Sequence, residues 1–167
     1  MLNTYDKQNL PTHFTLKTIF AKIKYWGVVY MFNKITTPLT GKIQYINSGI
    51  IKAVKSDGEK ISVGKIEYQK FEDNSYQYII TPFWNVINLL PTNVFAGIPG
   101  IKMEKRLDQY YRVNYEPVFI KERTPPPNRE DLWELMESVG LDYYDRLEWL
   151  IRTPMRAAND NLIVERE

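Results

Sequence analysis

Three consecutive prolines, residues 125–127, divide this sequence into two parts with different hydrophobic periods. Proline fixes φ and lacks a backbone N–H, so the segment is extended and cannot continue a strand ladder or a helix. Before it, stretches rich in β-branched and aromatic residues alternate with turn residues, as is typical of strands. After it, apolar residues recur at helical spacing. The prolines therefore predict a rigid boundary between a β-sheet body and a helical segment. The alternative is a polyproline segment that docks into an aromatic groove.

The part before the prolines has the pattern of an antiparallel meander. The expected strands are one or two in residues 14–35, then "KIQYI", "GIIKAVK", "EKISVGKIEYQKF" and "SYQYIITPFW". The sequences "NSG", "SDGE" and "EDNS" are expected to form the turns between them, and Pro82 is expected to end the last strand. Lysines alternate with apolar residues, which predicts one wet face and one buried face. Further on, "MEKRLDQYYRV" is expected to form a short helix and "EPVFIKER" an edge strand.

The part after the prolines predicts two short helices. Asn128 is expected to cap the first, with Asp131 three residues later in a variant of the capping box, and Gly140 is expected to end it. Asp142 is expected to cap the second, which runs to about Arg152. The side chains expected to face inward are Leu132, Leu135, Met136 and Val139 in the first helix, and Tyr143, Leu147, Leu150 and Ile151 in the second. The C-terminal "NDNLIVERE" is expected to form a turn and a short final strand.

The sequence thus predicts an α+β fold, in which a twisted antiparallel sheet of five or six strands carries a C-terminal helical hairpin. The domain boundaries follow from the same patterns. We expect a flexible arm over residues 1–13, a β-rich body over 14–124, and a proline hinge with a helical hairpin packed on the body over 125–167. A chain of 167 residues is long enough to bury a core without disulfides.

Composition excludes several classes of protein. The chain has no cysteine, which excludes disulfide scaffolds, thiol catalysis and thiolate metal sites. No apolar run approaches the ~20 residues of a membrane span, and the polar N-terminal sequence lacks the apolar core of a signal peptide. A cytoplasmic protein without a membrane partner is expected. The single histidine, His13, lies in the expected arm, so neither a metal site nor a catalytic histidine is predicted.

Catalytic and cofactor motifs are also missing from the sequence. It contains no Walker loop, dinucleotide fingerprint, HExxH motif, nucleophile elbow or kinase signature. The sequence "GIPG" at residues 97–100 is typical of a plain turn, with an anion-binding nest as the alternative. We therefore expect no enzyme and no cofactor.

Charge is distributed unevenly along the chain. Residues 1–100 contain 11 lysines and no arginine against 6 acidic residues, whereas residues 101–167 contain 11 basic and 14 acidic residues. The acidic helices also carry aromatic residues, and Trp149 shares a helical face with charged side chains, so we expect it to be exposed. Exposed aromatic residues beside charges are typical of protein interfaces, although they also pack on sheets. The residues predicted to bind a protein partner are Trp133, Tyr144, Trp149, Arg146, Glu130 and Glu134.

Nucleic-acid binding is the alternative function. Lysines interleaved with tyrosines on a sheet can follow a phosphate backbone while the aromatic rings stack on bases. The residues that would form this surface are Lys42, Lys52, Lys55, Lys65, Tyr45 and Tyr68. Lysines on an exposed sheet also prevent aggregation through its edges, which would leave them without a ligand.

The stretches "VGKIEYQKFEDNSYQYIITPFW", "VFAGIPG" and "NREDLWELMESVGLDYYDRLEWL" follow one another within residues 63–151. In this order they resemble the N-terminal subdomain of HipA-type kinases, which also occurs as a separate small protein in some toxin–antitoxin operons. The resemblance covers about half the chain and carries over no functional residue, because the family's proline- and serine-rich strand has no clear match. It implies a non-catalytic module that docks on a kinase or an antitoxin. The sequence therefore predicts a regulatory protein–protein interaction module of a toxin–antitoxin system, a defence system or a mobile element.

Overall fold

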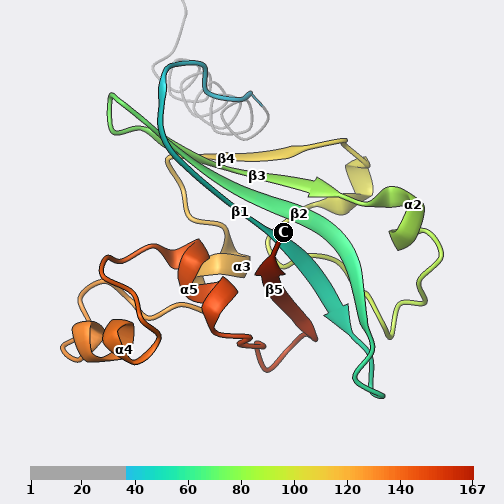
Figure 1. The fold of residues 1–167 in the computed structure, drawn as a ribbon. Helices are drawn as coiled ribbons and strands as arrows, with labels where there is room; N and C mark the ends of the chain where they lie inside the picture. Colours follow the sequence, from blue (N-terminus) through green and yellow to red (C-terminus); the bar gives the residue numbers. More distant parts are fainter. Residues whose placement is uncertain (1–36) are drawn as a thin grey trace, which may run out of the picture. The chain divides into compact units, whose positions relative to one another are not determined.

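A computed structural model describes residues 37–167, and a five-stranded antiparallel sheet forms their centre (Figure 1). The strand order is β4-β3-β2-β1-β5. The strands are β1 (Ile43–Val54), β2 (Lys60–Phe71), β3 (Tyr76–Pro82), β4 (Tyr110–Val113) and β5 (Leu162–Arg166). The predicted α+β class is confirmed, and the described residues form five of the predicted five or six antiparallel strands. The predicted arm over residues 1–13, with His13, and the strands predicted in residues 14–35 lie outside the described residues.

The first three strands form two hairpins whose turns match the predicted turn sequences. Gly58 adopts a φ of 88° in the β1–β2 turn, and Asn74 adopts a φ of 63° in the β2–β3 turn. In each turn an aspartate carboxylate accepts a backbone N–H two residues later, from Glu59 and from Ser75, both at 2.9 Å. Pro82 ends β3 as expected. These local signals placed the hairpins correctly.

The turn predicted at "NSG" is wrong, because β1 continues through residues 47–49. Asn47 is buried, and its side-chain amide donates to Asp145 (3.1 Å) and Glu148 (3.2 Å). A Cβ on Gly49 would stand 2.6 Å from Val164 Cγ1 of the neighbouring strand. The polar residue has distant partners and the glycine allows a close strand approach, so neither signals a turn here.

Two further segments differ from their predicted structure. The predicted helix "MEKRLDQYYRV" is a single 3₁₀ turn, η1 (Met103–Lys105), followed by β4. The predicted edge strand "EPVFIKER" is a helix, α3 (Val118–Lys121). The adjacent residues Phe119 and Ile120 are both fully buried, which an edge strand cannot achieve because its successive side chains point to opposite faces. A short helix, α2 (Trp84–Ile87), follows β3.

The last two helices are α4 (Leu132–Ser138) and α5 (Arg146–Arg152), and both begin later than predicted. Asp131 rather than Asn128 precedes α4, and its carboxylate makes no capping bond because it binds the guanidinium of Arg129. Asp145 rather than Asp142 caps α5. The predicted end of α4 is confirmed. Gly140 has a φ of 69° there, and the N–H groups of Gly140 and Leu141 donate to carbonyls of the last turn, as in a Schellman motif.

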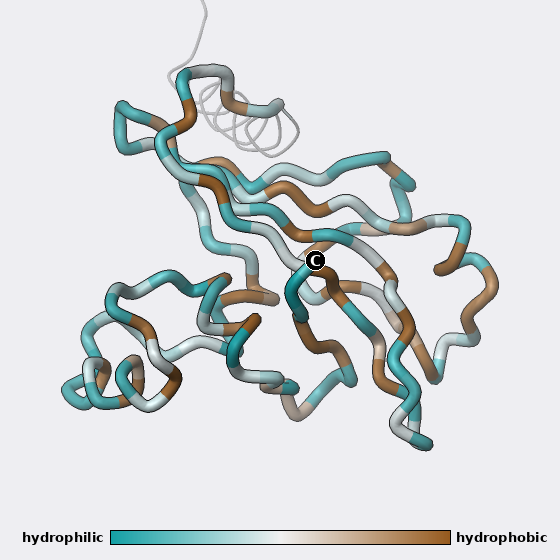
Figure 2. Tube along the Cα trace, in the orientation of Figure 1, coloured by the Kyte–Doolittle hydropathy of each residue, from teal (hydrophilic) through white to brown (hydrophobic). Residues whose placement is uncertain are grey.

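The core lies between one face of the sheet and segments from both sides of the prolines, which contribute Phe95, Ile98, Phe119 and Ile120 before them and Leu147 and Leu150 after them. β5 pairs with β1, and α5 lies against both strands. Figure 2 shows hydrophobic and hydrophilic residues alternating along the strands, which leaves one apolar face. Of the predicted inward residues of the second helix, Leu147 and Leu150 are buried and Ile151 is partly buried, but Tyr143 is exposed. No helix within residues 37–167 is long and apolar enough to cross a membrane.

Candidate functional site

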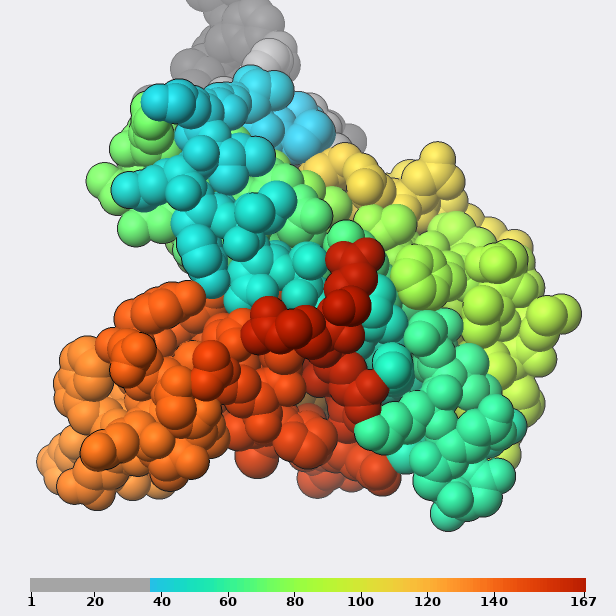
Figure 3. Space-filling view, viewed as in Figure 1, coloured from blue at the N-terminus to red at the C-terminus, as the bar shows by residue number. Residues whose placement is uncertain are grey.

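The most distinctive feature of the described residues is a tyrosine-lined pocket of about 720 Å³. The sheet and the loop that leads into α5 form its walls, and Figure 3 shows a notch where the cyan start of β1 faces the orange segment before α5. The tyrosines that line it are Tyr45, Tyr68, Tyr76, Tyr78, Tyr143 and Tyr144. This volume lies within the range of about 300–1,000 Å³ typical of ligand sites in proteins.

Strand register places four of these tyrosines on one face of the sheet. Tyr68 of β2 stands opposite Tyr78 of β3, and directly opposite residues share a face. Tyr45 and Tyr76 both stand opposite Lys70, two positions along β2 from Tyr68, so they lie on the same face. The same face continues into the apolar core in the other direction. The pocket therefore lies at the open end of the sheet face that carries the apolar core, where the side chains on that face are tyrosines.

The tyrosine rings that line the pocket pack against one another. The ring centroids of Tyr68 and Tyr78 are 5.0 Å apart, and those of Tyr76 and Tyr78 are 6.2 Å apart with the planes at 87°. Tyr143 meets Tyr45 edge to face at 6.4 Å. Tilted and edge-to-face arrangements are the favoured ones for aromatic pairs. The pocket consequently has walls of large aromatic area.

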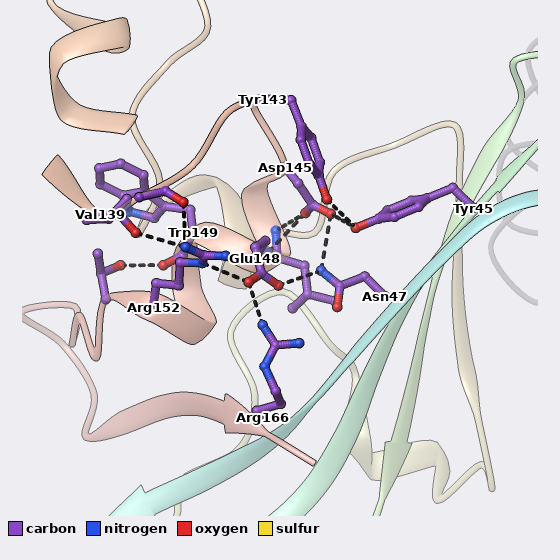
Figure 4. Close-up of polar contacts among 12 residues, drawn as sticks. Tyr45, Asn47, Val139, Tyr143, Asp145, Glu148, Trp149, Arg152 and Arg166 are labelled. Atoms are coloured by element: carbon purple, nitrogen blue, oxygen red, sulfur yellow. Dashed lines mark hydrogen bonds and ion pairs between the residues drawn. The ribbon is translucent and has the colours of Figure 1, made fainter. Parts of the chain in front are cut away.

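Asp145 joins the two walls of the pocket (Figure 4). Its Oδ1 accepts the first free N–H groups of α5, from Leu147 (2.7 Å) and Glu148 (3.0 Å). Its Oδ2 accepts the hydroxyl of Tyr45 (2.7 Å) and the amide of Asn47 (3.1 Å), both on β1. One buried carboxylate thus caps the helix and fixes it to the sheet.

Arg146 joins the pocket to the proline segment. Its Nε lies 2.6 Å from Glu116 Oε1, and its Nη1 donates to Thr124 Oγ1 at 2.6 Å. The guanidinium also lies 5.4 Å from the ring of Tyr144, whose hydroxyl donates to the carbonyl of Pro125. The third proline lines the pocket itself. The proline segment is therefore part of the pocket wall, held there by side chains of the same chain.

Behind the pocket, Glu148 accepts hydrogen bonds from three side chains (Figure 4). They come from Arg152 Nε (2.8 Å), Asn47 (3.2 Å) and Arg166. Burial acts to raise the pKa of Glu148, but the hydrogen bonds from Arg152 and Asn47 and the two nearby arginine charges outweigh it. The pKa of Glu148 is therefore held below its ordinary value of 4.5.

This lowered pKa predicts how the stability of the protein responds to acid. A carboxyl group whose pKa is lower when folded stabilises the fold above its unfolded pKa, and that contribution is lost as pH falls through the folded value. Denaturant unfolding of wild type and Glu148→Gln between pH 7 and pH 3 should show a stability difference that shrinks below about pH 4.5. The exposed Glu137→Gln should show almost no difference across this range. A gap between wild type and Glu148→Gln that stays constant with pH would contradict the prediction.

Several polar groups that line the pocket have no partner in the part of the chain that the structure describes. Among residues 37–167, no hydrogen bond involves the hydroxyls of Tyr68, Tyr76 or Tyr78, and no hydrogen bond or ion pair involves the side chain of Lys70. Tyr78 is only 4% exposed, and burial raises its pKa above the ordinary value of 10, so its hydroxyl stays protonated. These polar groups are not among the buried side-chain atoms that lack a partner, so they open onto the pocket and can form hydrogen bonds with a ligand there.

The structure divides the residues predicted to bind a protein partner into three groups. Tyr144 and Arg146 line the pocket. Glu130, Trp133 and Glu134 are exposed at α4, and none of them lines the pocket. The expected exposure of Trp149 is wrong, since it is 6% exposed. Four consecutive residues of α5, Leu147 to Leu150, are buried, so this short helix is covered on several sides and has no free face for an aromatic anchor.

The residues of the nucleic-acid alternative do not form one surface. Tyr45 and Tyr68 line the pocket, whereas strand alternation places Lys52 and Lys65 on the opposite face of the sheet. All four lysines are also paired with glutamates. The pairs are Lys42–Glu72, Lys52–Glu165, Lys55–Glu59 and Lys65–Glu167.

The loop at residues 97–100 is held by the protein itself. Gly97 and Gly100 adopt φ values of 116° and 77°. The N–H of Ile98 donates to Met103 Sδ, and Arg112 donates to the carbonyl of Gly100 at 2.8 Å. These contacts fit a structural turn. Among residues 37–167 no group of three or more histidine, aspartate or glutamate side chains could hold a metal ion.

Comparisons of the chain with protein-family models, with curated proteins and with solved structures find no match. The class that fold and site define is an α+β chain with a tyrosine-lined pocket at the open end of its core.

Proposed function

We propose that the protein is a non-catalytic binding module that takes a segment of a protein partner into the tyrosine pocket. The observation that carries the proposal is the set of six tyrosines around one cavity, with the hydroxyl of the buried Tyr78 left without a partner among residues 37–167. Tyrosine combines a large, rigid apolar ring with a polar tip, and it dominates binding surfaces for this reason. The pocket offers these contacts in an already ordered arrangement, which lowers the entropy lost on binding.

The use of the charged groups supports binding rather than catalysis. Asp145 accepts four hydrogen bonds as a helix cap, and Glu116 is paired with Arg146. Both carboxylates are therefore engaged with groups of the same chain and are not free to take a proton from a ligand. The described residues that line the pocket include no serine, cysteine, threonine or histidine to act as a nucleophile or a proton carrier.

The proposal includes the kind of partner that the sequence resemblance implies. A non-catalytic module of this kind would dock on a kinase or an antitoxin and regulate it in the cytoplasm, within a toxin–antitoxin system, a defence system or a mobile element. Nucleic acid is the second candidate partner, because tyrosine rings that line a pocket are also able to stack on bases. It is the weaker of the two, because the lysines that would contact phosphates are paired with glutamates.

Peptide selection tests the proposal and requires no candidate partner. Selection of a random displayed peptide library against the chain should enrich binders whose affinity falls about tenfold or more in Tyr76→Ala. The matched control is Trp133→Ala, which removes an exposed aromatic side chain outside the pocket and should change affinity less than about twofold. Affinities of synthetic peptides measured by calorimetry give both values.

Three outcomes of the selection would contradict the proposal. One is that the enriched peptides bind Tyr76→Ala as tightly as wild type. Another is that Trp133→Ala alone abolishes binding, which would place the partner on α4. The last is that no peptide is enriched while a single-stranded oligonucleotide binds tightly and loses affinity in Tyr76→Ala, which would identify nucleic acid as the partner.

A further inference from the structure

The unpartnered groups of the pocket also define the chemistry of its ligand, provided that the pocket is the binding site proposed above. Lys70 stands directly opposite Tyr45 on one side and Tyr76 on the other. Directly opposite residues on paired strands have Cβ atoms about 4.5–5.5 Å apart. Lys70 therefore starts from the same stretch of the sheet as Tyr68, Tyr76 and Tyr78, and all four residues line the pocket.

The acidic groups of the pocket are already engaged. Both oxygens of Asp145 accept two hydrogen bonds each, so this carboxylate has little capacity left for a ligand. The charge of Glu116 is compensated by Arg146 at 2.6 Å. A cationic ligand would find no free carboxylate, and it would meet the charge of Lys70. Among the described residues that line the pocket, Lys70 is the charged group that remains available to a ligand.

We infer that the pocket binds an anionic oxygen group, a carboxylate or a phosphate ester, carried by a side chain of the partner segment. Lys70 provides the charge-assisted hydrogen bond, and the hydroxyls of Tyr68, Tyr76 and Tyr78, which have no partner among residues 37–167, provide further donors. The tyrosine rings contact the apolar part of the same side chain. Asp145 repels an anion less than an isolated carboxylate would, because four donors and the N-terminus of α5 already stabilise its charge.

Small probes of matched size test this inference on the full chain. The probes are phenyl phosphate, phenylacetate, benzyl alcohol and phenyltrimethylammonium, titrated at constant ionic strength and followed by backbone amide chemical shifts. We expect one or both anions to bind about fivefold or more tightly than the alcohol and the cation. A preference for phenyl phosphate identifies a phosphorylated side chain, and a preference for phenylacetate identifies an acidic one.

Two variants and one control assign the effect to these groups. Lys70→Met should weaken binding of the preferred anion about tenfold and leave benzyl alcohol unchanged. Tyr78→Phe should weaken the anion about threefold or more while the protein stays folded, because the hydroxyl that it removes has no partner among residues 37–167. Lys65→Met removes a lysine from the opposite face of the sheet and should leave the affinity for every probe unchanged.

The outcomes separate this inference from the function on which it rests. If the cation or the alcohol binds as tightly as the anions, or if Lys70→Met has no effect on anion binding, the inference of an anionic ligand is wrong. The pocket would still be a binding site in that case. If no probe shifts any residue of the pocket and peptide selection yields no binder that depends on Tyr76, both the inference and the proposed function are wrong.

Discussion

Asp160→Ala is expected to lower the free energy of unfolding by about 3–5 kcal/mol, because it leaves a buried guanidinium without its counter-ion. The side chain of Arg123 is 1% exposed and pairs with Asp160, whose own side chain is 14% exposed. The guanidinium lies 4.3 Å from the ring of Phe119 and donates to its backbone carbonyl at 2.8 Å. This pair joins α3 to the turn before β5. Denaturant unfolding monitored by circular dichroism measures the loss.

The exposed ion pair Arg129–Asp131 supplies the control for this variant. Its two side chains are 47% and 41% exposed, and exposed pairs contribute about 0–1 kcal/mol. Asp131→Ala should therefore change stability by less than about 1 kcal/mol. If Asp160→Ala were as mild as Asp131→Ala, water would have to reach Arg123, and the buried ion pair would not stabilise the connection between α3 and β5.

The parts of the fold that could be predicted from the sequence are those that local chemistry decides. Turn residues at "SDGE" and "EDNS" placed two hairpins. Pro82 ended a strand, and Gly140 ended a helix through a positive φ that favours glycine. Each of these signals acts within a few residues of its own position. The fold class followed from them and required no long-range contact.

The predictions that are wrong depend on partners far along the chain. Asn47 and Gly49 carry turn chemistry, yet β1 runs through them because their neighbours are α5 and β5, about 100 residues later. Asp142 and Asp145 are both suitable helix caps in sequence. Asp145 is the residue that caps α5, and its second oxygen also accepts hydrogen bonds from Tyr45 and Asn47 on β1. Local propensity cannot rank two aspartates that differ only in tertiary contacts.

The candidate site was predictable only in part for the same reason. The register that the "EDNS" turn sets brings Tyr68 opposite Tyr78, so a row of tyrosines on one face could have been found by pairing the two strands. The second wall could not have been predicted in this way, because the position of α5 decides whether Tyr143 and Tyr144 lie near the sheet. Two lysines of the nucleic-acid alternative pair with Glu165 and Glu167 of the C-terminal segment, which sequence spacing does not reveal.

Asp145→Ala is expected to lower the free energy of unfolding by about 3 kcal/mol, from the lost helix cap and the unpaired amide of buried Asn47. The same variant should abolish pocket binding under folding conditions, because Asp145 accepts the shorter of the two hydrogen bonds that join the loop wall to the hydroxyl of Tyr45, at 2.7 Å against 3.2 Å for Tyr143. Asp142→Ala, three residues earlier and exposed, is the matched control and should change stability by less than about 0.5 kcal/mol. Denaturant unfolding and peptide titration of both variants measure the two effects. If Asp142→Ala proved the more damaging variant, α5 would begin where the sequence alone placed it, and Asp145 would not join the two walls of the pocket.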